Sequence, residues 1–285
     1  MDPFTVKIPE DHLDEARVTL LDMDDTFARR PKGKHEVFRI AYSGGVIIGY
    51  KTGSIVANTH GAAGLLRKVL RGMDFPDETK IVIGSDEVGK GEWLGPLVVC
   101  AVALSPENTR ELRAAGVQDS KELTPHQIGS IAYDIEKNSL AIESVLIPPD
   151  TFEKRLSEMR KEGKNLNDLL AWAHAKAVSQ AYEEIGSLRE DSGIKIVIDE
   201  FAAKKTRLRL EREIDLDAIE LVQKPAAEDV IAVAAASIMA RDLRDEWLDR
   251  LSQELGFELV GITIEEAKKR KNLKRFAKLS YLKGL

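Results

Sequence analysis

The stretch that decides the fold is IVIGSDEVGKGEWLGPL, residues 81–97. It begins as an apolar strand and ends that strand with two adjacent carboxylates, Asp86 and Glu87. Its GSDEVGKG portion is one residue short of a P-loop, which needs Gly, four residues, Gly, Lys and then Ser or Thr. Gly91 stands in the Ser/Thr place, and Pro96 with an apolar strand follows where a P-loop begins a helix. The phosphate-cradle interpretation therefore fails, and the two carboxylates need another explanation.

Acidic residues end two more elements of the predicted fold. Asp199 ends the strand KIVID, and Glu228 and Asp229 stand at the start of an alanine-rich helix. A carboxylate at the end of a buried strand is costly unless it is paired or binds a cation. Oxygen ligands of this kind suit Mg²⁺ or Mn²⁺, and two such ions catalyse phosphodiester hydrolysis. On spacing alone, acids that merely cap elements or face solvent remain the alternative.

Composition bounds the class of protein. The chain has 285 residues, of which 43% are hydrophobic and 32% charged, as in a soluble globular protein of one large domain with or without a small companion. Its apolar runs are too short to span a bilayer, and no secretory pattern opens the chain, so we expect a cytoplasmic protein without a membrane partner. The single cysteine, Cys100, lies in an apolar run and is expected to be a buried, inert thiol.

Basic residues are clustered although the formal net charge is −6. Eight of them, and no acid, lie between Lys268 and the C-terminus: Lys268, Lys269, Arg270, Lys271, Lys274, Arg275, Lys278 and Lys283. A second cluster comprises Lys204, Lys205, Arg207, Arg209 and Arg212. Solvated helix faces are the ordinary explanation for either cluster, but two in an acidic protein favour a polyanionic partner.

The pattern predicts a small α+β domain over residues 6–73. Residues 10–17 are expected to be helical, residues 36–59 to form a three-stranded meander, and residues 62–72 to form an amphipathic helix. Residues 74–79 are a predicted linker, and residues 1–5 have the look of an expression-vector remnant and are set aside.

Residues 80–285 are predicted to form an α/β domain. Strands are expected at 80–86, 94–104, 140–149 and 194–201. Long helices are expected at 165–186 and 228–256, and the basic C-terminal segment is expected to be a final helix.

Five ordered motifs resemble the type 2 ribonucleases H, and more closely their ribonuclease HIII branch. They are IGSDEVGKGEWLGPLVV (83–99), DSKELT (119–124), NLNDLLAWAHAKAV (165–178), IDEFA (198–202) and AVAAASIMAR (232–241). The resemblance covers roughly residues 80–245 and implies a ribonuclease H-like mixed sheet with flanking helices. The front unit resembles the TATA-binding-protein-like substrate-binding domain of that branch through its hairpin GYKTGSIVAN (49–58), which contains the candidate contacts Tyr50 and Lys51.

The resemblance implies an endonuclease that cleaves the RNA strand of RNA/DNA hybrids. Two Mg²⁺ or Mn²⁺ ions per site and 3′-OH and 5′-phosphate products are expected. By motif, Asp86, Glu87 and Asp199 would be three of four metal-binding carboxylates, and Glu228 the fourth. The interval from Glu228 to Ser237 is one residue shorter than the family pattern, so Asp229 stays an alternative ligand.

Substrate-binding residues follow from the same resemblance. Gly89, Lys90 and Gly91 would bring bare backbone against the nucleic acid. Ser120, Lys121, Asn165 and Asn167 are candidate donors to phosphates or 2′-hydroxyls, with turn and helix capping as the alternative for each asparagine.

Two other functions stay open beside hybrid cleavage. The ribonuclease HII branch has Gly-Arg-Gly at this turn and senses RNA–DNA junctions with a tyrosine. Lys90, and a Tyr281 too loosely placed to match that tyrosine, favour HIII. Cleavage at single embedded ribonucleotides and non-catalytic hybrid binding remain the alternatives, and no obligate protein partner is indicated.

Two further patterns are set aside. VTLLDMDDT (18–26) fits the Asp-x-Asp-x-Thr opening of haloacid-dehalogenase phosphatases, but a basic loop and a short meander follow instead of a doubly wound domain. The histidines show no ligand spacing, and His174, near a family motif, is expected to have a packing or surface role.

Overall fold

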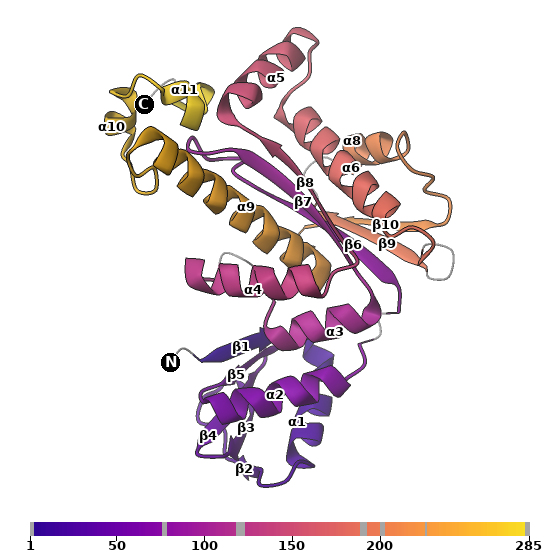
Figure 1. Cartoon of the computed structure of the whole chain (residues 1–285). Coiled ribbons are helices and arrows are strands. Elements are labelled where there is room, and N and C mark those ends of the chain that lie inside the picture. Colours follow the sequence, from indigo (N-terminus) through magenta and orange to yellow (C-terminus); the bar gives the residue numbers. More distant parts are fainter. Residues whose placement is uncertain are drawn as a thin grey trace. The chain divides into compact units, whose positions relative to one another are not determined.

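The computed structural model describes residues 3–75, 79–117, 123–188, 193–199, 203–225 and 227–282. The chain forms two compact units, whose elements are labelled in Figure 1. Unit 1 comprises Met1–Thr79 with Pro106–Gln118, and unit 2 comprises Lys80–Ser105 with Asp119–Leu285. The segment at 106–118 thus groups with unit 1, although the sequence predicts it within the second domain.

Unit 1 is built on a five-stranded antiparallel sheet of order β1-β5-β4-β3-β2. The predicted meander is confirmed as β3 (Glu36–Tyr42), β4 (Gly45–Tyr50) and β5 (Ser54–Ala57). The sequence analysis missed both edge strands, β1 (Phe4–Lys7) and β2 (Phe27–Arg29). Phe4 and Thr5 pair with Ala57 and Val56, so these two residues of the expected remnant are part of the sheet.

Four helical segments cover this sheet or join it. They are η1 (Glu10–His12), α1 (Leu13–Leu21), α2 (His60–Gly72) and α3 (Pro106–Ala115). Helix α2 buries one face because its apolar residues recur every three or four positions: Ala62, Leu65, Leu66, Val69 and Leu70. The predicted linker is partly in this core, since Phe75 is buried beneath the guanidinium of Arg113 at 4.3 Å.

Unit 2 contains a mixed five-stranded sheet of order β10-β9-β6-β7-β8. Its strands are β6 (Ile81–Val88), β7 (Leu97–Leu104), β8 (Ala141–Ile147), β9 (Ile194–Asp199) and β10 (Ile219–Lys224). Strand β6 pairs parallel with β9 and antiparallel with β7, and β10 pairs parallel with β9. The mixed α/β sheet expected from the sequence is confirmed, and β10 is the strand that the prediction missed.

Two long helices cover the two faces of this sheet (Figure 1). Helix α6 (Leu166–Glu184) packs on the face of Ile83, and α9 (Ile231–Leu255) packs on the face of its neighbour Gly84. A Cβ atom on Gly84 would lie 2.2 Å from the carbonyl carbon of Ala232, so the glycine and the small residues of α9 permit this approach.

Shorter helices complete unit 2. The sequence analysis did not predict α4 (Pro125–Lys137), α5 (Pro149–Lys161) or α8 (Ala203–Leu210). Within the described ranges, no helix is long and apolar enough to cross a bilayer.

The predicted C-terminal helix is wrong. The segment forms three short pieces, α10 (Ile264–Lys268), α11 (Leu273–Phe276) and η4 (Leu279–Leu282). Between the last two, Ala277 is extended and forms a β-bridge with Leu94. The helix ends at Phe276 because the following backbone pairs with residues 93–95 instead, the N–H of Lys278 donating to the carbonyl of Trp93 at 2.7 Å.

Candidate active site

Two of the candidate carboxylates lie near the carboxyl ends of the neighbouring parallel strands β6 and β9. Ser85 of β6 pairs with Ile198 of β9, so continuing this register would place Asp86 beside Asp199 on one face of the sheet. The short helix η3 (Ala227–Asp229) contacts β9 and brings the backbone of Glu228 to this place. The side chain of Glu228 lies outside the described part of the structure. Its alternative, Asp229, is exposed.

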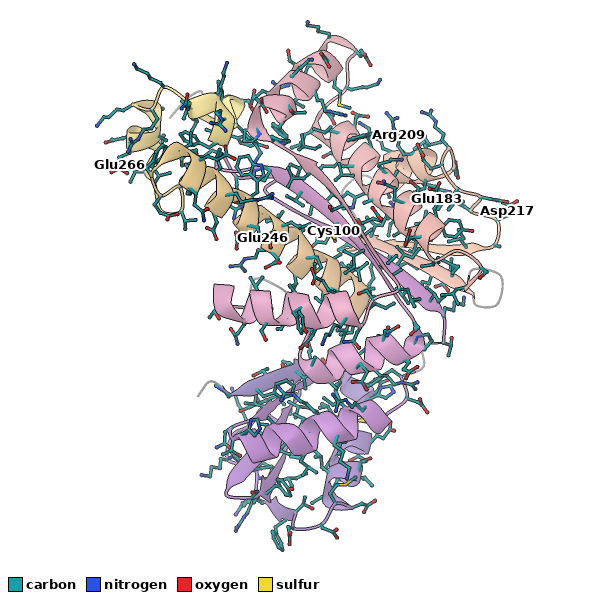
Figure 2. The ribbon with its side chains drawn as sticks, in the orientation of Figure 1. Cys100, Glu183, Arg209, Asp217, Glu246 and Glu266 are labelled. Carbon is teal, nitrogen blue, oxygen red and sulfur yellow. The ribbon has the colours of Figure 1, made fainter. Side chains whose placement is uncertain are left out.

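Asp86 is a carboxylate held in a buried position. It lies opposite Cys100 in the β6–β7 ladder, and Figure 2 labels that cysteine in the sheet. Burial and then the charge of Glu87 raise the pKa of Asp86 to about 6, although a hydrogen bond from Ser237 of α9 favours its charged form. A positive charge beside this group would therefore be strongly stabilising.

Glu87 is buried too but has the opposite pKa shift. Burial alone would raise its pKa, yet a hydrogen bond from His174 and the charges of His174 and Lys90 lower it to about 2. Lys90 Nζ lies 3.2 Å from Glu87 Oε1, and His174 Nε2 lies 3.1 Å from Glu87 Oε2. Each oxygen of this carboxylate thus has its own cationic or N–H partner.

His174 connects this carboxylate to the sheet. It is completely buried on α6, and its Nδ1 lies 2.8 Å from Ser85 Oγ, which donates to the carbonyl of Cys100 at 2.8 Å. Because a carboxylate only accepts, His174 Nε2 carries a proton toward Glu87. The expected packing or surface role was incomplete. The sequence does contain a sign of this role: His174 is polar at a position of the helix where the periodicity requires an apolar residue, between Leu170 and Ala177.

The residues fit a divalent cation by chemistry and charge. Their donors are carboxylate oxygens, which Mg²⁺ and Mn²⁺ prefer, and the ammonium of Lys90 already occupies one side of Glu87. Among the side chains that the structure describes, no group of three or more His, Cys, Asp or Glu lies close enough to hold an ion. The full four-carboxylate set therefore stays a prediction.

The glycine turn after β6 contains two glycines in different situations. Gly89 has φ +85° and a Cβ there would lie 2.2 Å from the carbonyl oxygen of Pro96, so the fold itself demands glycine. Gly91 is exposed, and a Cβ there would meet nothing within 4 Å. Within the described part of the chain, no neighbouring atom therefore requires a glycine at position 91.

The other predicted substrate-binding residues have different surroundings in the structure. Asn165 caps α6, its side chain accepting from the N–H of Asn167 at 3.0 Å, so the capping alternative holds for it. Asn167 lies in the first turn and is half-buried. Tyr50 and Lys51 lie at the end of β4 in unit 1, half-buried and exposed respectively. Ser120 and Lys121 lie outside the described residues.

Both basic clusters contain ion pairs. In the cluster at 204–212, Lys205 binds Asp168 at 2.7 Å and Arg207 binds Glu211 at 2.8 Å. In the C-terminal cluster Arg275 binds Glu254 at 2.7 Å, and the basic residues from Lys268 to Arg275 are exposed, whereas Lys278 is fully buried. Lys278 is thus not part of a basic surface.

The phosphatase-like motif forms a helix end and a turn, as predicted. Asp22 is the C-cap of α1, Asp25 has φ 60°, and Thr26 Oγ1 donates to the carbonyl of Met23 at 2.8 Å. A nucleophile of that phosphatase class would follow a buried parallel strand instead.

Comparisons with known proteins found a matching family model and similar proteins. The family model described as Ribonuclease HII matches residues 83–278. Ribonuclease HIII of Protochlamydia amoebophila is 37% identical over 177 residues, which cover 62% of this chain and only 55% of that protein. Ribonuclease HIII of Geobacillus sp. is 27% identical over 275 residues, covering 90% of this chain and 88% of that protein.

A solved structure shares the fold. The crystal structure of Bst-RNase HIII in complex with Mn²⁺ matches with a TM-score of 0.61 and 23% identity, covering 98% of this chain and 96% of that one. At this identity the likeness concerns the fold alone.

Proposed function

From the fact that this chain belongs to the type 2 ribonucleases H, on their ribonuclease HIII branch, we propose that it is an endonuclease that hydrolyses the RNA strand of RNA/DNA hybrids. The observation that carries the proposal is the pair Asp86 and Glu87 near the end of β6, which are half-buried and have opposite pKa shifts. The proposal includes a cytoplasmic location and no obligate protein partner.

The proposed ligands are Asp86, Glu87, Asp199 and Glu228, with Asp229 as the alternative fourth. Two Mg²⁺ or Mn²⁺ ions, when bound, would activate a water molecule and stabilise the leaving oxygen, which gives 3′-OH and 5′-phosphate ends. Asp86 is oriented by Ser237, and Glu87 is oriented by His174, so the protein fixes two of the ligands before any cation arrives. Bst-RNase HIII, which shares this fold, was crystallised in complex with Mn²⁺, and this supports the choice of metals.

Substrate binding is proposed for both units. Gly89, Lys90 and Gly91 would approach the hybrid backbone closely, with Asn167, Ser120 and Lys121 as further donors. Unit 1 would be a TATA-binding-protein-like domain that uses Tyr50 and Lys51. The exposed basic residues from Lys268 to Arg275 would add phosphate contacts, so binding should weaken as salt rises.

One observation favours a second candidate. Tyr281 Oη lies 2.5 Å from the carbonyl oxygen of Lys90, so a tyrosine does lie against the glycine turn, which the sequence analysis did not expect. A tyrosine near this turn accompanies junction sensing in the ribonuclease HII branch. Cleavage at single embedded ribonucleotides is therefore kept as the alternative.

The test is cleavage of two labelled duplexes by the purified protein, with Mg²⁺, Mn²⁺ or a chelator. One duplex is a full RNA/DNA hybrid, and the other is DNA with a single ribonucleotide. Metal-dependent cleavage of the hybrid alone supports the proposal, and cleavage of both supports the second candidate. Binding of the hybrid without cleavage under any metal would contradict catalysis and leave a binding protein.

A further inference from the structure

A segment near the C-terminus lies against the glycine turn and the residues that follow it. The backbone N–H of Gly95 donates to the carbonyl of Phe276 at 2.8 Å, and that of Lys278 donates to the carbonyl of Trp93 at 2.7 Å. Ala277 forms the β-bridge with Leu94 between them. Residues 276–281 are called the clamp below.

The ammonium of Lys278 binds the turn itself. Its Nζ donates to the carbonyl of Gly89 at 3.0 Å and to that of Glu92 at 2.9 Å. The side chain is 0% exposed, so it reaches neither solvent nor nucleic acid. Burial lowers the pKa of Lys278 to about 7, which shows how unfavourable this position is for a charge. A lysine placed here acts through the two carbonyls that it binds.

Tyr281 binds a third carbonyl of the turn, that of Lys90, which lies between Gly89 and Glu92 in the chain. Its hydroxyl donates to the carbonyl of Lys90 at 2.5 Å, while its ring packs against Phe152 with centroids 6.1 Å apart. Three of the four carbonyls from Gly89 to Glu92 are therefore bound by two side chains of the clamp.

The direction of these carbonyls determines where the neighbouring N–H groups of the turn point. In a trans peptide the C=O and the following N–H point in opposite directions, and the described residues contain no cis peptide. Since the carbonyls of Gly89 and Lys90 point at the clamp, the N–H groups of Lys90 and Gly91 point away from it. Two successive N–H groups that follow a residue of positive φ form a concave donor site for oxyanions.

We propose that Lys278 and Tyr281 are positioning residues that fix the turn so that its N–H groups meet the sugar-phosphate backbone of the substrate. The inference rests on the proposed function, because it assumes that the turn binds an RNA/DNA hybrid. It deepens that proposal by assigning the geometry of the turn to two side chains that lie about 190 residues further along the chain.

The test compares Tyr281→Phe, Lys278→Met and Ser280→Ala in the full chain. The first removes one hydroxyl and keeps the ring, and the second removes the ammonium and keeps the volume. Ser280 is the matched control, because it lies in the same helical turn but its hydroxyl donates to Glu153 at 2.7 Å and not to the turn. Each variant is measured for KM and kcat on the hybrid, for the Mn²⁺ concentration that gives half the maximal rate, and for Tm.

Tyr281→Phe should raise KM by about threefold to tenfold, which corresponds to the loss of one hydrogen bond. Lys278→Met should raise KM by about tenfold or more, because two buried carbonyls lose their donor. The kcat and the Mn²⁺ requirement should stay within about twofold of wild type, since the carboxylates are untouched. Ser280→Ala should match wild type in KM.

The outcomes distinguish failure of the proposed function from failure of the clamp proposal. If the wild-type chain neither binds nor cleaves the hybrid, the proposed function fails and the clamp is not at issue. If the wild type cleaves but Tyr281→Phe keeps its KM, or loses kcat and Mn²⁺ affinity instead, the clamp is overturned. Should Lys278→Met lower Tm so far that it cannot be assayed, Tyr281→Phe decides alone.

Discussion

The imidazole of His174 is held between two residues of one strand, Ser85 and Glu87. Its Nδ1 lies 2.8 Å from the Ser85 hydroxyl, and its Nε2 lies 3.1 Å from Glu87 Oε2. Residues two apart on a strand point to the same face, so a single ring on α6 reaches both. The helix therefore restrains the rotamer of a proposed metal ligand.

Two substitutions of His174 separate these contacts. The amide nitrogen of His174→Asn falls near the position of Nδ1 and keeps the bond to Ser85, whereas that of His174→Gln falls near Nε2 and reaches Glu87. Loss of a partner that orients a ligand typically costs about 10-fold to 100-fold in metal affinity or activity. We expect His174→Asn to show that loss in the Mn²⁺ titration of activity, and His174→Gln to recover most of it.

The comparison has an internal control. Both variants place an uncharged amide in the same buried site, so a general loss of packing would affect them alike. Equal Mn²⁺ requirements for the two variants, at equal Tm, would remove His174 from the positioning of Glu87.

Asp86→Asn should abolish cleavage and stabilise the metal-free protein. Burial and the charge of Glu87 raise the pKa of Asp86, so its ionised form is unfavourable in the empty site, and a neutral amide avoids this cost. A carboxyl with a raised folded pKa destabilises the fold as pH rises from its unfolded pKa of about 3.9 to its folded pKa of about 6, so the gain in Tm should be complete at pH 7 and small at pH 4. Thermal unfolding in chelator at both pH values measures it.

The same variant tests the metal site without an activity readout. A cation that binds only the folded wild type raises its Tm, and the stabilisation grows with the logarithm of the cation concentration once that concentration exceeds Kd. Mn²⁺ should therefore raise Tm for wild type and leave Asp86→Asn nearly unchanged. Equal shifts in the two proteins would show that the ion binds elsewhere.

The periodicity of the sequence was sufficient for the central elements. Strand β7 has all eight residues buried, and α6 and α9 bury small residues at helical spacing, so each pattern is long and unambiguous. The short edge strands β1, β2 and β10 were missed, because three to six residues of mixed polarity have no distinctive period. Segment 106–118 was assigned by sequence order, whereas its packing with unit 1 is a tertiary property.

The places of the candidate site residues in the fold could be predicted where the residues lie near the end of an element, and not where they come from a distant one. Asp199 ends β9 and Asp86 lies two residues before the end of its neighbour β6, and the sequence indicates both strand ends. His174 and Lys278 are polar residues in apolar surroundings, and only the folded chain shows what each one binds. The C-terminal segment misled the prediction because its basic residues share a charge but not a helical face.

Gly91→Ala should weaken substrate binding without affecting the fold. A Cβ at 91 would meet no atom of the protein within 4 Å, so Tm should stay within about a degree of wild type. The added methyl group would project where the hybrid backbone is proposed to approach, so KM should rise. Gly89→Ala is the contrast, because positive φ and the Pro96 carbonyl should make that variant unstable. A wild-type KM for Gly91→Ala would show that the substrate stays away from this turn.

The contact of β6 with α9 should be sensitive to an added methyl group. A Cβ on Gly84 would lie 2.2 Å from the Ala232 carbonyl carbon and 2.3 Å from the Val233 nitrogen, both backbone atoms that cannot rotate away. Gly84→Ala should therefore lower the free energy of unfolding by on the order of 3 kcal/mol. It should also displace Asp86, two residues further along the same face, and so impair activity.

Gly129→Ala is the matched control for that change. Gly129 is exposed within α4 and a Cβ there would meet nothing within 4 Å, so this variant should gain about 0.5–1 kcal/mol from helix propensity. Urea unfolding followed by tryptophan fluorescence measures both variants, because all three tryptophans, Trp93, Trp172 and Trp247, belong to unit 2 and report its unfolding. If Gly84→Ala unfolds at the same urea concentration as wild type, β6 and α9 can separate more readily than their backbone contact implies. In that case Gly84 does not determine the distance between Asp86 and Ser237.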